Sequence, residues 1–473
     1  MGVGEQVHKR EPRRLVPGQA TVEGAKRAIP WSRDQSGSSL LGRDIALVVV
    51  AAFLLRVILA VVLHYVVFAH GYSNFFTRGD DQGYDETAWQ QTQVWRGTLP
   101  EVTIGYRYLL NVYTYTGAAV YLVFGHRVFA MIIVNCLFGA LSAGVIFAIA
   151  RQCFDRQAAL VAAIATAFLP TIAFWSLLNL KDAMYLFLMT LAMWIFTTFL
   201  KTGNRWLIVP VLLVLALIGG LRLVVQGILT LIFPIAVVLQ PARAFQRKWS
   251  TAALLLGCCA VLLWFSGGAA WIAEALPRAN IMRSYTSQGA GSGFAPVAPS
   301  AAPQGPAAPS ASTTSTPAGD PGTGNAPSAA QEPQLNGRHE LRTLIRWLPM
   351  GLVYATLAPF PWSAARLIER ALIPDMLLWY GALILAGGAI VVYRRRFREF
   401  AHLLGYIAAI LLAFAAASGN VGLIVRQRSM MVAPFILIFS GAGAVWLWRW
   451  WWSKRAVRPA AAGSAIAQDN PTE

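Results

Sequence analysis

The stretch Arg78-Gly-Asp-Asp-Gln-Gly-Tyr-Asp-Glu-Thr-Ala-Trp89 follows shortly after a hydrophobic run at residues 45–68 that is long enough to cross a bilayer. Four carboxylates fall within seven residues of this stretch: Asp80, Asp81, Asp85 and Glu86. Carboxylates beside a membrane are costly unless they are solvated or used. We therefore interpret this stretch as one wall of a candidate active site that is held in place by hydrophobic helices.

The composition is that of a membrane protein with several spans. Of the 473 residues, 56% are hydrophobic and only 13% are charged, whereas soluble domains carry about 25% charged residues. The net charge of +18 could suggest a nucleic-acid partner. Most of the basic residues, however, flank apolar runs, where they report topology, so nucleic-acid binding is not expected.

The four cysteines favour neither a disulfide framework nor a metal site. Cys136, Cys153, Cys258 and Cys259 lie in or beside apolar runs, where a cysteine usually serves as a small hydrophobic residue. The polar N-terminal segment 1–44 has no short apolar core beside a small-residue cleavage site. It is therefore expected to be a cytoplasmic tail and not a signal peptide.

Hydropathy and the positive-inside rule predict an all-α polytopic protein with about 10 transmembrane helices and both termini in the cytoplasm. The tyrosine-rich segment 106–125 is expected to form a helix on the outer surface, because tyrosine prefers the membrane interface. The break at residues 219–222 divides the apolar run 206–240 into two short spans. The predicted spans are residues 45–69, 127–150, 157–175, 183–200, the two within 206–240, 251–272, 375–393, 400–417 and 430–450.

This topology implies a domain organisation along the chain. The cytoplasmic tail 1–44 precedes a transmembrane core at 45–272 with a first outer loop at 70–126, and the outer segment 273–374 precedes C-terminal spans at 375–450 and a cytoplasmic tail at 451–473. Within the outer segment, residues 287–336 are rich in Pro, Ala, Ser and Gly, and this composition predicts disorder. Residues 338–371 are interrupted by prolines and are expected to form short interfacial helices, while residues 418–428 are expected to be an outer loop.

Several charged residues lie on the predicted outer face, where the positive-inside rule makes Lys and Arg unexpected. Arg binds phosphate through a planar fork of donors, Lys binds it as a point charge, and a nearby carboxylate can act as general base. A site for a lipid phosphate would explain the whole set. Its candidate residues are Asp80, Asp81, Lys181, Asp182, Arg222, Arg426 and Arg428.

Ordinary structural roles compete with this interpretation. Asp85 and Glu86 are expected to be solvated surface carboxylates, and Lys181-Asp182 could be a helix start with a snorkelling lysine. Arg426 and Arg428 could anchor to lipid headgroups, while Arg56 lies too deep in a span to be neither paired nor functional. Interfacial histidines are expected at the three positions that lack metal-ligand spacing, His64, His70 and His126.

The layout resembles a GT-C glycosyltransferase, close to the protein-mannosyltransferase and lipid A aminoarabinose-transferase group. In that group a first span leads to an outer loop with Asp-Glu-x-x-Tyr, and Asp80-Asp81-Gln-Gly-Tyr84 is similar, with Asp81 in place of Glu. The group's basic loop after the next span is similar to Ala150-Arg-Gln-Cys-Phe-Asp-Arg-Gln-Ala-Ala159. Its second outer loop follows a proline, here Pro170, and bears a polar pair, here Lys181-Asp182.

The resemblance implies a polyprenyl-phosphate-sugar donor and an extracytoplasmic acceptor, which could be a glycan, a glycolipid or a protein. It implies Asp80 as the general base, with Asp81 as the close alternative. It places the phosphate with Lys181, Arg222, Arg426 and Arg428, beside Tyr84. Asp182 could orient a hydroxyl or bind a divalent cation; no other cofactor is expected.

Two other functions stay open on the sequence alone. An O-antigen-type polymerase or ligase also handles polyprenyl-linked glycans outside the membrane, and it would depend on the outer arginines with Asp80 and Asp81 dispensable. A glycolipid flippase would favour inverted repeats and a charged path through the membrane. The chain shows no such repeat, and its polar residues gather on one predicted face.

Overall fold

The computed structural model describes residues 38–67, 80–103, 109–240, 248–268, 337–363 and 372–456, together with the single residues 279, 283 and 370. The chain divides into Met1–Asp44 and Ile45–Glu473. Residues 1–37 of the predicted N-terminal tail, Arg78 and Gly79, the predicted disordered segment 287–336, and residues 457–473 of the C-terminal tail lie outside the described residues.

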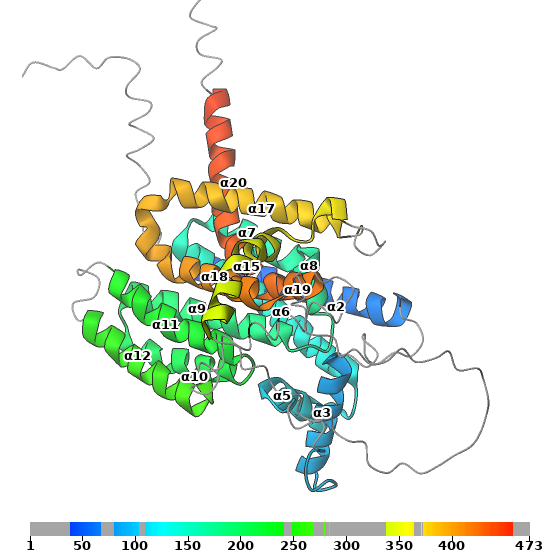
Figure 1. Ribbon diagram of the computed structural model, residues 1–473. Coiled ribbons are helices and arrows are strands. Elements are labelled where there is room, and N and C mark those ends of the chain that lie inside the picture. Colours follow the sequence, from blue (N-terminus) through cyan, green and yellow to red (C-terminus); the bar gives the residue numbers. More distant parts are fainter. Residues whose placement is uncertain are drawn as a thin grey trace, which may run out of the picture. The chain divides into compact units, whose positions relative to one another are not determined.

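All elements in the described part of the chain are helical (Figure 1). Five helices are long and apolar enough to cross a membrane, and a bent pair at the C-terminal end raises the number to six. The protein is therefore a multi-pass membrane protein, as predicted. The remaining predicted spans fall on shorter apolar helices: Arg156–Phe168, Arg205–Gly219, Leu223–Leu239 and Trp249–Phe265.

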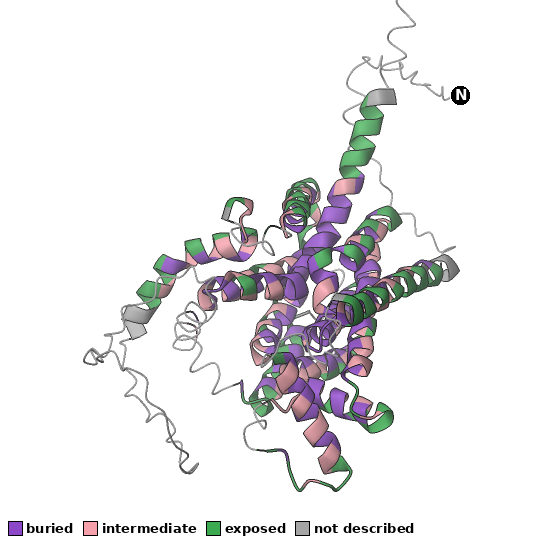
Figure 2. Ribbon diagram, turned by 90° about the vertical axis from the view of Figure 1, so that its right-hand side faces the viewer, coloured by how far each residue is buried: buried purple, intermediate pink, exposed green. Residues whose placement is uncertain are grey.

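The centre of the second unit is built from α6 (Val128–Cys153) and α9 (Asp182–Thr202), which pack against each other. In α9, 78% of the apolar window is buried, against 17% in the first span, Gly42–Val66. Buried residues gather in the interior, and exposed ones cover the outlying helices (Figure 2). The first five residues of α9, Asp182–Leu186, are all buried, so the neighbouring helices hold the start of α9 in place.

The predicted span 157–175 consists of two helices, α7 (Arg156–Phe168) and α8 (Pro170–Trp175). Pro170 takes the first position of α8, where its missing N–H group costs no helical hydrogen bond. The span therefore breaks at Leu169. This break leads the chain into the segment 176–181, which connects to α9.

Arg56 holds the first span to this break. It lies fully buried in α2 (Ser38–Val61), which continues as a π-helix over Val62–Val67. Its guanidinium donates to the Oγ of Ser176 at 3.0 Å and to the carbonyl of Ala167 at 2.9 Å. The buried guanidinium of Arg56 is thus hydrogen-bonded to carbonyl and hydroxyl oxygens, and these bonds give Arg56 a structural role.

The predicted break inside residues 206–240 separates α10 (Ile208–Gly219) from α11 (Leu223–Leu239). At this turn the side chain of Gln226 packs closely against Gly219: a Cβ there would lie 2.1 Å from the Oε1 of Gln226, so a larger residue would displace this side chain. The turn leaves Arg222 at the start of α11, beside the start of α9. The next helix, α12 (Lys248–Phe265), packs against α11.

Two predictions for the C-terminal half are wrong: the short helices expected at the start of 338–371 and the outer loop expected at 418–428. Residues 337–357 form one continuous helix, α15 (Gly337–Leu357), with Pro349 inside it. Pro349 removes one hydrogen bond of the helix, but packing against α18 (Phe397–Ala417) keeps the helix continuous. The Nε1 of Trp347 donates to the carbonyl of Ala415 at 2.8 Å, and the backbone of Gly351 approaches Ala415 closely.

The predicted outer loop at 418–428 is mostly helical. Residues Val421–Met431 form α19, whose first turn is capped by Asn420 accepting from the backbone N–H of Leu423 at 3.2 Å. The long helix α20 (Ala433–Ala456) follows at an angle of 61°. It packs against α17 (Ile373–Val392) and α7.

Candidate active site

The candidate site is centred on Asp182, in the first turn of α9. Its carboxylate is fully buried and accepts from the Nε and Nη2 of Arg426 at 2.9 and 2.5 Å and from the Nη2 of Arg222 at 3.1 Å. Both oxygens are therefore occupied by guanidinium groups from α19 and the α10–α11 turn. The positive end of the α9 dipole adds to the stabilisation of this buried charge.

Arg426 also joins this centre to the start of α3 (Asp80–Trp95). Its Nη1 donates to the Oδ2 of Asp80 at 3.1 Å. The side chain of Asp80 is 63% exposed, whereas that of Asp182 is completely buried. One arginine thus bridges an accessible carboxylate and an inaccessible one, two of the residues that the sequence predicts for the site.

Lys181 completes the cationic set. Its Nζ donates to the carbonyl of Leu221 at 3.3 Å and lies 5.6 Å from the ring centroid of Tyr84. Burial, followed by repulsion from Arg222, lowers the pKa of Lys181 to about 8. Burial, followed by the charge of Asp80, raises the pKa of Tyr84 to about 12. Tyr84 therefore stays neutral at physiological pH and presents a ring face to the lysine.

Asp81 has a different environment from its neighbour Asp80. It is fully buried, its Oδ1 accepts from the backbone N–H of Gln82 at 3.0 Å, and its carbonyl accepts from the Nδ2 of Asn179 at 3.4 Å. The Oδ1 of Asn179 accepts the hydroxyl of Tyr113 at 2.6 Å. Asp81 therefore takes part in the packing of α3 against the segment before α9.

Asn135, Asn179 and Tyr113 are site-supporting residues that the sequence reasoning missed. The Nδ2 of Asn135 donates to the hydroxyl of Tyr113 at 2.9 Å and to the carbonyls of Leu178 and Leu180 at 2.7 and 3.1 Å. It thereby fixes the segment that leads into Lys181. A buried amide inside the apolar span 127–150 is the sequence signal that could have identified Asn135.

Arg428 lies away from this cluster, although it is only two residues from Arg426. Residues at this spacing leave a helix in different directions. The Nη1 of Arg428 donates to the carbonyls of Thr356 and Ala358 at 3.0 and 2.5 Å, and its guanidinium lies 4.8 Å from the ring centroid of Trp379. Its described contacts hold the end of α15 against α17.

Asp85 is expected to be a solvated surface carboxylate, but this prediction is wrong. It is buried one turn after Asp81, where its Oδ1 accepts the hydroxyl of Tyr121 at 2.6 Å and lies 3.0 Å from the Nε2 of His126. His126 stacks on Trp89, with ring centroids 4.6 Å apart. These contacts join α3 to α5 (Val112–Phe124), the helix found within the predicted surface segment 106–125. Glu86 remains partly exposed and accepts from the Nε2 of Gln82 at 2.9 Å.

The charges favour an anionic ligand. Lys181, Arg222 and Arg426 bring three positive charges to Asp182 and Asp80, so one positive charge remains unbalanced. The Nε of Arg222 is buried without a hydrogen-bond acceptor among the described residues. Within the same part of the chain, no group of three or more His, Cys, Asp or Glu side chains could hold a metal ion. A divalent cation does not fit at Asp182, because both of its oxygens already face guanidinium groups.

Among the solved structures that are similar to this chain are two of archaeal oligosaccharyltransferases. The oligosaccharyltransferase AglB from Archaeoglobus fulgidus, in complex with an inhibitory peptide and a dolichol-phosphate, is 12% identical; the match covers 90% of this chain and 52% of that one, with a TM-score of 0.43. The Archaeoglobus fulgidus oligosaccharyltransferase tethered with an acceptor peptide is 13% identical, with coverages of 87% and 51% and a TM-score of 0.44. The chain thus spans about half the length of both proteins.

Among curated proteins, none matches the chain significantly. A family model does match it: residues 111–271 fit the family described as dolichyl-phosphate-mannose-protein mannosyltransferase. The matched region contains Lys181, Asp182 and Arg222 together with Asn135 and Asn179. Residues 111–271 therefore carry the signature of this glycosyltransferase family, which confirms the predicted resemblance to the protein-mannosyltransferase group of GT-C enzymes.

Proposed function

We propose that this protein is a membrane glycosyltransferase that moves a sugar from a polyprenyl-phosphate donor to an acceptor on the extracytoplasmic face. The acceptor is a hydroxyl-bearing glycan, glycolipid or protein. The observation that carries the proposal is the arrangement of Lys181, Arg222 and Arg426 around Asp182, with the exposed carboxylate of Asp80 at its edge.

The proposed topology has ten spans, with both termini in the cytoplasm. Its support is that the basic segments cluster at one end of the helices. Lys201 lies in the last turn of α9 and Arg205 follows that helix, and Arg394–Arg396 follow the end of α17, whereas Asp182 and Asp375 lie at the starts of these two helices. The positive-inside rule assigns the basic end to the cytoplasm and the Asp182 end to the outside.

The donor phosphate is the ligand that the cations would take. The buried Nε of Arg222 and the N–H groups of Lys181 that its described hydrogen bond leaves free are available donors. A phosphate beside them would neutralise the excess positive charge. It would also compete with Asp80 for Arg426, because the Asp80–Arg426 pair lies at the exposed edge of the cluster.

Asp80 is the better candidate for the general base. Its carboxylate is accessible to an acceptor hydroxyl, whereas Asp81 is fully buried. In the proposed step the acceptor oxygen forms a bond to the anomeric carbon, and the bond from this carbon to the phosphate oxygen breaks. The acceptor proton passes to Asp80, and the electron pair of the broken bond leaves with polyprenyl phosphate. The configuration at the anomeric carbon is inverted.

The test measures transfer from radiolabelled polyprenyl-phosphate sugars in membranes that contain the parent protein or a variant. We expect Asp80→Asn to lower the rate by about 100- to 10,000-fold, the usual contribution of a general base, with normal expression and donor binding. Glu86→Gln is the matched control, because it makes the same change on the same helix outside the cluster, and it should keep parent activity.

Full activity in both Asp80→Asn and Asp81→Asn would contradict the proposed base. If transfer then still required Arg222 and Arg426, the O-antigen-type polymerase or ligase would be the better assignment. Loss of activity in Asp81→Asn alone, with a normally folded protein, would move the role of base to Asp81.

A further inference from the structure

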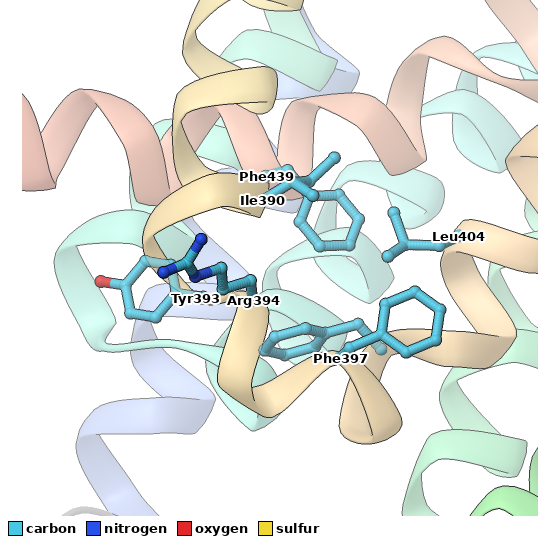
Figure 3. Close-up of a pocket in the computed structure, with 7 residues that line it drawn as sticks. Ile390, Tyr393, Arg394, Phe397, Leu404 and Phe439 are labelled. Carbon is cyan, nitrogen blue, oxygen red and sulfur yellow. The ribbon is translucent and has the colours of Figure 1, made fainter.

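A small apolar cavity lies at the end of the bundle away from Asp182. It has a volume of about 50 Å³ and lies between the end of α17, the start of α18 and the side of α20 (Figure 3). Ile390, Phe397, Leu404 and Phe439 line it, and Tyr393 and Arg394 border it. The side chain of Arg394 thus places a cationic group beside an apolar cavity (Figure 3).

The cavity and the candidate active site lie at opposite ends of the same helices. Asp375, at the start of α17, accepts from the hydroxyl of Thr171 in α8 at 3.0 Å, so this end of α17 lies by the segment that leads to Asp182. Tyr393 directly follows the other end of this 20-residue helix. A helix of that length spans about 30 Å, the thickness of the hydrocarbon core of a bilayer.

Four arginines lie in or next to the connection between α17 and α18, and they differ in their hydrogen-bond partners. Arg396 donates to both carboxylate oxygens of Glu399, at 3.1 and 2.6 Å, and to the carbonyl of Cys153 at 3.1 Å. Arg394, Arg395 and Arg398 are exposed, and none of their guanidinium groups has an ion pair or hydrogen-bond partner among the described residues. Arg394 borders the cavity, and Arg395 and Arg398 lie one and four residues further along the chain, so positive charge without a described partner is concentrated near the cavity.

We propose that this cavity and its arginines form a binding site for an anionic phospholipid, with the phosphate at Arg394 and Arg395. In a phospholipid, the charged phosphate lies directly above the apolar start of the acyl chains. The site has the same order, with the guanidinium group of Arg394 beside an aromatic and aliphatic cavity that admits the first methylene groups. Basic pockets between transmembrane helices are known to bind anionic headgroups.

Exposed apolar side chains on the helices that border the cavity support this occupant. Phe397 is 50% exposed, and Val391 and Ile384 on α17 are 65% and 75% exposed. The rest of an acyl chain can therefore continue along α17 after its first carbons enter the cavity. A soluble anion would match the arginines alone, whereas a phospholipid matches both the arginines and the apolar surface. Under the proposed topology, the lipid belongs to the cytoplasmic leaflet.

The test titrates the full-length protein, purified in a neutral detergent, with phosphatidylglycerol or with phosphatidylcholine of the same acyl chains, and counts bound lipids by native mass spectrometry. We expect preferential retention of phosphatidylglycerol. The double variant Arg394→Gln/Arg395→Gln should bind it about 30-fold more weakly, given the usual attraction of an anionic lipid surface for each basic residue.

A matched control separates a local site from general attraction. Arg151→Gln/Arg205→Gln removes two charges from the same end of the helices without touching the cavity, and it should retain the parent preference. Leu404→Phe fills the cavity without changing the charge, and it should also weaken phosphatidylglycerol binding at an unchanged unfolding temperature of the lipid-free protein. Equal losses in the two double variants would overturn the proposal, as would equal retention of the two lipids by the parent.

Discussion

Arginines lie at both ends of the helices, and their environments differ. At the start of α9, Arg222 and Arg426 are partly buried and form ion pairs with Asp182, which has no exposed surface. At the end of α17, Arg394 and Arg395 are exposed, and no carboxylate among the described residues contacts them. The positive-inside rule explains the second pair through topology alone. It does not explain the first pair, whose partial burial is balanced by a carboxylate partner and, in our proposal, by a phosphate ligand.

The largest expected effect is on the free energy of unfolding, and it concerns Asp182 at the start of α9. Asp182→Asn removes the carboxylate that both guanidinium groups share, and breaking one side of a buried ion pair typically costs about 3–5 kcal/mol. We expect a large fall in the unfolding temperature of the purified protein. Arg394→Gln at the exposed end should change the free energy of unfolding by less than about 0.5 kcal/mol. Similar shifts in the two variants would contradict the contrast between the two ends.

Arg426 and Arg428 sharpen the contrast within a single helix. Arg426→Gln should raise the KM for the polyprenyl-phosphate donor by about 10- to 100-fold, because a hydrogen bond to a charged group contributes about 1.5–3 kcal/mol. Arg428→Gln loses contacts to Thr356 and Ala358 but none to the Asp182 cluster. It should lower stability without a selective effect on KM. An equal rise of KM in both variants would show that the direction of the side chain does not matter.

These contrasts also show how much the sequence could predict. The positive-inside rule marks Lys181, Arg222 and Arg426 as unexpected on the outer face, and the structure brings all three to Asp182. The predicted topology suffices for this grouping, because it assigns all three residues to connections between spans on one side of the membrane. The same reasoning included Arg428, since a predicted loop at 418–428 carries no information on side-chain direction. The direction follows only from the helix α19.

The misjudged burial of Asp85 has a similar cause. Its partners Tyr121 and His126 lie 36 and 41 residues further along the chain. A local pattern of four carboxylates cannot reveal which of them face such partners. The helix that begins at Asp80 distributes the four over different faces, so that Asp81 and Asp85 are buried while Asp80 is exposed. The packing of α3 against α5 therefore decides which carboxylate is accessible.

The pH dependence tests whether Lys181 is protonated when it acts. Because the pKa of Lys181 lies at about 8, its ammonium form is present below that pH and is lost above it. We expect kcat/KM to fall about tenfold for each pH unit above 8, since this parameter reports the free enzyme. Lys181→Arg keeps its charge at these pH values, so any residual activity should lack this alkaline fall. An identical profile in parent and variant would exclude Lys181 as the titrating group.

The smallest effect distinguishes Arg396 from its neighbour Arg395. Arg396 has two hydrogen bonds to Glu399 and one to the carbonyl of Cys153, but the side chain of Glu399 is nearly half exposed, so solvent weakens the ion pair. Arg396→Gln should therefore cost only about 1 kcal/mol, the usual upper value for such pairs, while Arg395→Gln should leave stability unchanged. Unfolding temperatures of the two purified variants provide the measurement. If Arg395→Gln were the more destabilising change, Arg395 would have a structural contact of its own, and the exposed end would resemble the buried one.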